Sequence, residues 1–351
     1  MVAVTLVAGL RGDRRVFWSV LNAIGLRESV VQFMLVNALL ALSIYLTLHS
    51  GMFSLANAGF MSIGAYVGVI ATQHFGLPLG SALALGMLVA AAISLPLGAP
   101  VLRLSDIYLA IATIGFGEIV RIFWLNFDGL ATSLVGHSVT LTGGALGIKG
   151  IPTSTKTWHL LLALAVAGYF MARLNDSRLG RAMSAIRQDE IGAASVGINP
   201  VYVKLVVFVL SAMLAAAGGV FSSHLTRIIS PGDFSFSRVV NILSYAVLGG
   251  TATWVGPIVG GLLLTALPEV ARPLQQYNQI FTGSVLLLVI VYLPGGIVDP
   301  RLWARLRDRL AGKQNNGDDG AAAAVEAGAA AAAAAEASAD AAAARREVGG
   351  R

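Results

Sequence analysis

The chain has 351 residues, of which 56% are hydrophobic and 12% are charged, with a mean hydropathy of +0.76 and a net charge of +6. Because a soluble domain carries roughly 25% charged residues, this composition excludes an ordinary soluble protein and indicates that lipid is part of the solvent. The absence of cysteine excludes disulfides and thiolate metal sites. The histidines lack metal-ligand spacing and the arginines flank apolar segments, so neither a metal nor a nucleic-acid partner is expected.

Apolar segments close to the roughly 20 residues that cross a bilayer recur along the chain. We expect spans at Ser29–His49, Phe53–Thr72, Ser81–Leu97, Ile107–Leu125, His159–Leu174, Val201–Ser223 and Thr282–Leu293 with its flanks. The region Val239–Ala271, interrupted by LGGTATWVGP, is expected to form two spans or one span and a re-entrant piece. The predicted fold is an all-α polytopic membrane protein of about eight (six to ten) transmembrane helices with broken or re-entrant segments.

Three segments rich in basic residues predict the orientation of these spans. They contain Arg11, Arg14, Arg15 and Arg27; Arg173, Arg178, Arg181 and Arg187; and Arg301, Arg305, Arg307, Arg309 and Lys313. The positive-inside rule places all three in the cytoplasm. The expected organisation is a cytoplasmic N-terminal arm (1–28), a transmembrane domain (29–300) with a polar cytoplasmic loop (175–200), and a cytoplasmic basic, alanine-rich, low-complexity tail (301–351).

The number of apolar segments conflicts with this orientation. Five of them precede the polar loop, whereas two cytoplasmic flanks require an even number of crossings. Either one segment is re-entrant or the count is wrong. The stretch GMFSLANAGFMSIGAY (51–66) has the glycines and polar residues of a broken helix, a structure tolerated at membrane depth only where it lines protein or water.

The sequence GRAMSAIRQDEIGAASVGINP (180–200) is a long polar stretch between two apolar ones. Asp189 is suited to cap a short helix with Glu190 in its first turn, and Gly197 suits the left-handed position after it. Asn199-Pro200 then reads as the cap and first residue of the next span. A helix of about two turns that exposes small residues is suited to dock into a groove on a partner; the alternative is an amphipathic connector on anionic lipid.

Several segments together resemble the LivM-type permeases of branched-chain amino acid ABC importers. GRAMSAIRQDEIGAASVGINPVYVKL resembles the cytoplasmic coupling loop of that family. The other matching segments, in the family's order, are LRLSDIYLAIATIGFGEIVRIF (102–123), LTGGALGIKGIP (141–152), ISPGDFSFSRVVNILSYAVLGGTATWVGPIVGG (229–261) and VYLPGGIVDP (291–300). The resemblance covers about Ser29–Pro300, so the N-terminal arm and the tail lie outside it.

The resemblance implies a multi-pass permease subunit in a bacterial inner membrane, with both termini cytoplasmic. It implies a path for leucine, isoleucine and valine formed with a LivH-like second permease, a periplasmic substrate-binding protein and two P-loop ATPase subunits. The ATPase-coupling residues it implies are Arg187, Gln188, Asp189, Glu190, Ile191, Ala193, Ala194 and Gly197. The chain has no Gly-x-x-x-x-Gly-Lys-Ser/Thr motif, so we expect no ATPase activity of its own, and no cofactor.

Other polar and glycine residues are weaker candidates. Ser54, Asn57, Ser62 and Tyr66, in the possible broken helix, and the pair Glu118 and Arg121 are candidates for the substrate path; the alternatives are helix packing and a structural ion pair. A loop expected to be external and flexible, with Gly143, Gly144, Gly147 and Gly150, is a candidate docking site for the binding protein. Gly256 and Gly260 suit close helix packing.

Two other functions stay open at this stage. The same architecture imports urea, amides or small aromatic acids in relatives, and no residue of this chain discriminates among these substrates. An ion-coupled secondary transporter is the alternative from another class, although such a transporter is expected to hold several acids near the midplane. Glu118 is the only acid well inside a clear span, which counts against that alternative.

Overall fold

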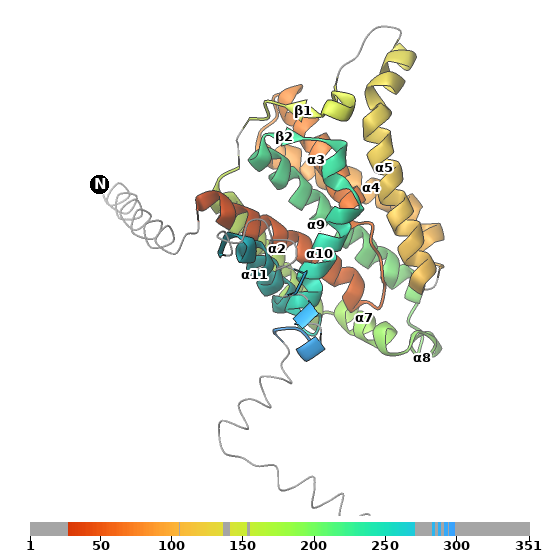
Figure 1. The fold of residues 1–351 in the computed structure, drawn as a ribbon. Helices are drawn as coiled ribbons and strands as arrows, with labels where there is room; N and C mark the ends of the chain where they lie inside the picture. The colour runs from red at the N-terminus through yellow and green to blue at the C-terminus, as the bar shows by residue number, and fades with distance from the viewer. Residues whose placement is uncertain are drawn as a thin grey trace, which may run out of the picture. The chain divides into compact units, whose positions relative to one another are not determined.

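A computed structural model describes residues 27–104, 106–135, 141–152 and 155–270, and the short pieces 283–284, 287–288, 291–293 and 295–298 (Figure 1). The predictions for residues 1–26 and for the alanine-rich tail lie outside the described residues. The predicted last span, Thr282–Leu293, lies largely outside them.

The described part is a bundle of helices, as predicted. Five helices are long and apolar enough to cross a membrane, namely α2 (Glu28–His49), α4 (Leu79–Val101), α5 (Asp106–Val135), α6 (Thr157–Asp176) and α9 (Pro200–Thr226). Three shorter helices complete the bundle, namely α3 (Asn57–Gln73), α10 (Phe236–Gly249) and α11 (Val255–Val270). The region Val239–Ala271 contains the two helices α10 and α11, both shorter than the five candidate spans. The fold is an all-α polytopic membrane protein.

The two ends of the bundle carry different elements. At one end the polar loop forms α7 (Arg178–Gln188) and α8 (Glu190–Ser195), and at the other the strands β1 (Ile148–Lys149) and β2 (Ile228–Ile229) pair antiparallel (Figure 1). We call these the α7–α8 end and the β1–β2 end. Two 3₁₀ turns, η1 (Gly144–Leu146) and η2 (Pro231–Phe234), lie next to the strands along the chain.

The first helix of the bundle begins at the β1–β2 end. Helix α2 runs antiparallel to α9, because Ser211 Oγ donates to Ser43 O (2.7 Å) and, farther along α9, Gly218 packs against Leu40. At the start of α2, Glu28 accepts a hydrogen bond from Oγ1 of Thr157, the first residue of α6 (2.8 Å). The far end of α6 leads directly into α7, so Glu28 and α7 lie at opposite ends of the bundle.

This arrangement corrects the predicted orientation of the N-terminal flank. Arg27 was expected on the same side as Arg187, but α2, α3, α4, α5 and α6 alternate in direction and their number is odd. The positive-inside rule treats each flank separately, whereas the number of helices fixes the relation between flanks. The expectation that Arg27 and Arg187 share one side is therefore wrong.

The predicted broken segment 51–66 is irregular only in its first part, before Asn57, while 57–66 belongs to the continuous helix α3. The chain turns at Gly51 (φ +77°), and residues 52–56 then return without helical structure into the bundle. The backbone N–H of Leu55 is satisfied there by Oγ1 of Thr113 (2.9 Å), as irregular backbone at membrane depth requires. Helix α3 begins at Asn57, beside Ser43 in the middle of α2, and still reaches the β1–β2 end, so the break does not change the number of crossings.

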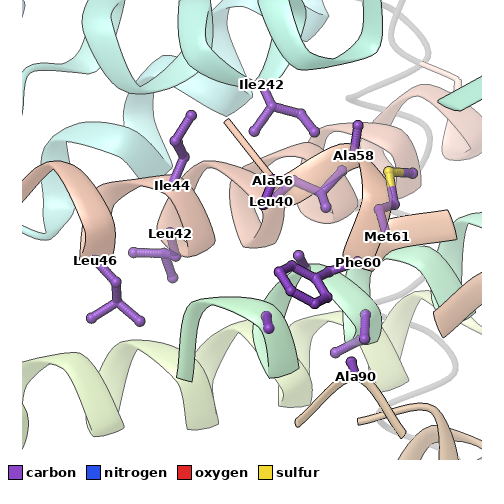
Figure 2. Close-up of a cluster of buried hydrophobic side chains, with 14 of the residues drawn as sticks. Leu40, Leu42, Ile44, Leu46, Ala56, Ala58, Phe60, Met61, Ala90 and Ile242 are labelled. Carbon is purple, nitrogen blue, oxygen red and sulfur yellow. The ribbon is translucent and has the colours of Figure 1, made fainter. Parts of the chain in front are cut away.

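Helix α2 is the centre of the bundle because it is hydrophobic on every side. Of its most apolar window 72% is buried, against 28% for α4 and for α6, which face outward. Figure 2 shows Ile44 and Leu46 pointing to opposite sides of α2, with Phe60 and Met61 of α3, Ala90 of α4 and Ile242 of α10 in the same cluster.

Glycine allows the closest helix contacts. A side chain at Gly64 would meet the backbone of Ala216, so α3 and α9 cross with almost no space between them. A side chain at Gly260 would meet the carbonyl of Tyr245, and one at Gly256 would meet the carbonyl of Gly250. The prediction that Gly256 and Gly260 serve helix packing is confirmed.

Candidate functional site

The α7–α8 segment is built by side-chain caps that the sequence largely predicted. Asp189 Oδ1 accepts a hydrogen bond from the N–H of Ile191 (2.9 Å) at the start of α8, and Gly197 follows the helix with φ +88°. Asn199 Oδ1 accepts from the N–H of Tyr202 (3.2 Å), and Pro200 is the first residue of α9. Helix α7, capped by Ser177, was not predicted, and it ends at Gln188.

The outer surface of α8 is apolar. The side chains of Ile191 and Val196 are 84% and 76% exposed, and Ala194 between them is also exposed. Ala193 faces the bundle and is 4% exposed. We call Ile191, Ala194 and Val196 the apolar tip. Val196 was not among the predicted coupling residues, although a valine directly before the capping glycine was a sequence signal for it.

Two of the three charged residues in the predicted coupling set, Glu190 and Arg187, contact the bundle, whereas Asp189 caps α8. Glu190 accepts from Nζ of Lys204 in α9 (2.6 Å). The Arg187 guanidinium donates to the backbone O and to Oγ1 of Thr251, both at 3.4 Å, in the loop between α10 and α11. The predicted set therefore divides into residues that can meet a partner and residues that connect α7 and α8 to the membrane helices.

The predicted substrate-path residues of 51–66 lie inside the bundle. Ser54, Asn57, Ser62 and Tyr66 are each at most 2% exposed. Asn57 Nδ2 donates to Oγ of Ser43 (2.8 Å) and of Ser211 (3.2 Å), and the Tyr66 ring stacks on Trp124 with centroids 4.5 Å apart. In the described part of the chain, the hydroxyls of Ser54, Ser62 and Tyr66 have no hydrogen-bond partner.

Glu118 and Arg121 do not join this group. Arg121 Nε donates to Oε1 of Glu118 (2.9 Å), and the pair lies on the outer face of α5, where the Glu118 side chain is 45% exposed and the neighbouring Ile119 is 67% exposed. The same face of one helix was predicted correctly. The structure does not place Glu118 and Arg121 in a common site with Asn57 and Tyr66.

The glycine loop at the β1–β2 end is a defined turn and not a flexible linker. Gly143, Gly144, Gly147 and Gly150 all have positive φ, between 54° and 74°, which side chains rarely adopt. Asp128 Oδ1 holds the start of the loop by accepting from the N–H groups of Leu141 (2.9 Å) and Thr142 (2.8 Å). The glycines therefore shape the loop, while the side chain it presents is Leu146, 74% exposed.

Comparison with known proteins places this architecture in a family. Residues 26–292 match the family model described as the permease component of branched-chain amino acid transport systems. The chain belongs to this family.

The family members most similar to the chain include two permease proteins called LivM. The LivM protein of the high-affinity branched-chain amino acid transport system of Salmonella typhimurium is 33% identical over 272 residues, covering 71% of this chain and 64% of LivM. The Escherichia coli LivM is 32% identical over 283 residues with the same coverage. The E. coli LivH permease is 28% identical over 167 residues, covering 47% of this chain and 52% of LivH. This chain thus spans about two thirds of the length of the LivM proteins, and no solved structure is significantly similar to it.

Proposed function

We propose that this chain is a permease subunit of an ABC importer and that the α7–α8 segment couples it to ATPase subunits. The supporting observation is the apolar tip. Ile191 and Val196 are exposed on a short capped helix outside the bundle, and an exposed apolar patch of this kind marks an interaction site.

The proposed direction of coupling follows the contacts of α8. ATP-driven closure of the ATPase subunits would push on the apolar tip. The ion pair of Glu190 with Lys204 carries the displacement into α9, and the hydrogen bonds of Arg187 carry it to Thr251 between α10 and α11. These helices then rock the path between outward-open and inward-open states.

The α7–α8 end is the cytoplasmic end in this proposal. It holds Arg178, Arg181 and Arg187, the cluster that the positive-inside rule assigns to the cytoplasm. The final described piece, through Ile297 and Val298, also lies there, hydrogen-bonded to Leu248 and Gly249. The β1–β2 end, with Arg27, is then external and receives the binding protein at the turn around Leu146. The membrane is a bacterial inner membrane.

The proposed substrates are leucine, isoleucine and valine, and the proposed partners are a LivH-like second permease, two P-loop ATPase subunits and a periplasmic binding protein. Support comes from the names of the relatives, since LivM and LivH are both permease proteins of high-affinity branched-chain amino acid transport. The alternative substrates of the same architecture, namely urea, amides and small aromatic acids, are tested by the same uptake assay.

The test is purification of the tagged chain from native membranes in mild detergent, with identification of the accompanying proteins. We compare the wild type with Ile191→Glu plus Val196→Glu, and with Leu146→Glu as a matched control, an equally exposed apolar residue at the other end. The proposal predicts P-loop ATPases with the wild type and the control and their loss from the double variant. If no ATPase co-purifies with any of the three proteins, the proposal is contradicted. Uptake driven by an ion gradient is then the function to measure. Import of leucine, isoleucine and valine by the co-purified complex then tests the substrate.

A further inference from the structure

Helix α10 contains a charged residue that the sequence analysis did not select. Arg238 is the one charged residue among the residues of α10, and its side chain is half-buried. Nη2 donates to Oδ1 of Asn37 in α2 (3.3 Å), while Nε is enclosed and has no partner. Within the part of the chain that the structure describes, Arg238 forms no ion pair. A guanidinium at membrane depth without a carboxylate is costly and marks a functional site.

The position of Arg238 is deep in the bundle. Asn37 lies nine residues after the start of α2 at Glu28, which is about 14 Å along a helix axis. This is near half of the roughly 30 Å hydrocarbon thickness. Helix α10 therefore begins near the middle of the membrane, after η2, and crosses the remaining half only. Half-helices that begin at this depth hold ligands in many transporters.

The start of α10 adds to the positive potential of Arg238. Ser235, the residue before the helix, makes no side-chain cap, so the first N–H groups of this 14-residue helix are free of a capping side chain. The positive end of the helix dipole and the guanidinium thus lie within one turn of each other. Both favour an anion.

The outward face of α10 carries polar side chains beside apolar ones, since Phe236, Val240 and Val247 are exposed as well. Ser237 and Asn241 are exposed and Ser244 is partly exposed, and their spacing of four and three residues places them on one helix face. The opposite face, with Val239, Ile242 and Ala246, is buried in the bundle. The three neutral hydrogen-bonding side chains indicate that their strip of this face contacts water or protein at membrane depth.

We propose that Arg238 and the start of α10 bind the carboxylate of the transported amino acid, in a water-filled path lined by Ser237, Asn241 and Ser244. A guanidinium recognises a carboxylate through paired hydrogen bonds. The site is a passing contact, since affinity is supplied by the binding protein. The identity of the ligand rests on the proposed function, whereas the anion site and the water-filled path do not.

The first test uses the absence of cysteine from the chain, which lets one introduced cysteine report alone. Membrane-impermeant methanethiosulfonates, one anionic sulfonate and one cationic trimethylammonium, are reacted with Asn241→Cys and with Ile111→Cys, a 61% exposed position on the outer face of α5. We expect Asn241→Cys to react, with the anionic reagent favoured about tenfold by the nearby charge. We expect Ile111→Cys not to react, and the preference to vanish in Asn241→Cys with Arg238→Gln. An unreactive Asn241→Cys, or a preference unchanged by Arg238→Gln, overturns the proposal.

The second test measures leucine import and ATP hydrolysis by the complete importer in proteoliposomes. Arg238→Gln is expected to lower the leucine imported per ATP about tenfold, the effect of one charge-assisted hydrogen bond. Arg238→Lys should retain part of the import, and Arg173→Gln, an exposed arginine on α6, should retain all of it. Asn37→Ala removes the partner of Arg238 but not its charge. If Asn37→Ala imports as little leucine as Arg238→Gln, and the two variants melt at the same temperature, then Arg238 acts only through its contact with Asn37. That result would show a structural role and overturn the proposed carboxylate site.

The two proposals fail in different ways. Wild-type protein that imports no amino acid but shows the Arg238-dependent labelling contradicts the proposed substrate and leaves the anion site. Wild-type protein that imports leucine, together with Arg238→Gln that imports it equally well, contradicts the carboxylate site and leaves the proposed function.

Discussion

Nζ of Lys204 lies 2.6 Å from Oε2 of Glu190, so the first residue of α8 is joined to the beginning of α9. The lysine side chain is only 12% exposed, while the glutamate is 51% exposed. Since α9 packs against α2, α3 and α4, a displacement of α8 reaches most of the bundle through this pair. In the proposed coupling, this ion pair transmits movement of α8 to α9 and contributes little to the stability of the fold.

The first prediction concerns this pair. Glu190→Gln and Lys204→Met should each lower leucine import a few-fold while ATPase subunits still co-purify, because the apolar tip is unchanged. The melting temperature should hardly move, since a half-exposed ion pair contributes only about 0.2–1 kcal/mol. Import and ATP hydrolysis by both single variants and the double variant form the measurement.

The double variant decides between a pair and two separate sites. If the two residues act through each other, the double variant imports as much as the worse single variant. Effects that add in the double variant would show that Glu190 and Lys204 act independently.

The second prediction concerns the turn at the β1–β2 end. Asp128→Ala removes the acceptor of three hydrogen bonds, from the N–H groups of Leu141 and Thr142 and from the Thr142 hydroxyl. We expect the loop to become sensitive to proteases and binding-protein docking to weaken about tenfold, because hydrogen bonds to a carboxylate contribute about 1.5–3 kcal/mol each. Limited proteolysis and a binding assay with the periplasmic protein measure this.

The control for the loop is Asn126→Ala on the same helix. Asn126 is exposed and donates only to the Ile122 carbonyl one turn away. The Asn126→Ala protein should resist proteases and bind the periplasmic protein as well as the wild type does. An Asp128→Ala protein that is as resistant and binds as well as this control would show that the turn is held by its glycines alone.

Local features of the sequence predicted local structure well. The cap at Asp189, the left-handed Gly197 and the Asn199-Pro200 start of α9 depend on neighbouring residues only, and all are present. The broken segment before Asn57 was likewise indicated by its glycines and polar residues. These features require no knowledge of which helices are neighbours.

Features that depend on neighbouring helices were not predictable. The side of Arg27 depends on the number of crossings, which one sequence leaves open at α3. Glu118 and Arg121 resembled path residues, but their orientation away from Asn57 is set by which face of α5 packs on α3. Arg238 gave a sequence signal, as a lone charge in an apolar stretch. That Arg238 forms no ion pair within the described residues becomes visible only when its neighbours in the bundle are placed.

The third prediction concerns Asn57, a buried amide that joins three helices. Its Nδ2 donates to Ser43 of α2 and Ser211 of α9, and the two serines themselves donate to backbone carbonyls. Asn57→Ala should therefore lower the free energy of unfolding by about 1–3 kcal/mol. The loss comes from the two hydrogen bonds of Asn57, because both serine hydroxyls still have an acceptor for their own proton. Thermal unfolding in detergent measures the change, with Asn126→Ala as the exposed control. Unchanged stability combined with altered discrimination between leucine and isoleucine would instead favour the substrate-path interpretation of Asn57.

The fourth prediction concerns the close contact between α3 and α9 at Gly64. A methyl group at Gly64 would overlap the backbone of Ala216, and backbone atoms cannot move aside as a side chain can. Gly64→Ala should therefore separate α3 from α9 and destabilise the fold by about 1–3 kcal/mol. Gly115→Ala is the matched control, because Gly115 lies on α5 with no atom near the added methyl group.

In the control the substitution acts only on helix propensity. Alanine in a helix interior is favoured over glycine by about 0.5–1 kcal/mol, so Gly115→Ala should melt at the wild-type temperature or slightly above it. Midpoints are compared in one detergent at one heating rate, because unfolding of membrane proteins on heating is often irreversible and rate-dependent. Melting midpoints that fall for Gly64→Ala and rise for Gly115→Ala would show that the close contact between Gly64 and Ala216 causes the loss of stability. Equal shifts would mean that α3 and α9 are not as close in the folded protein as Gly64 and Ala216 require.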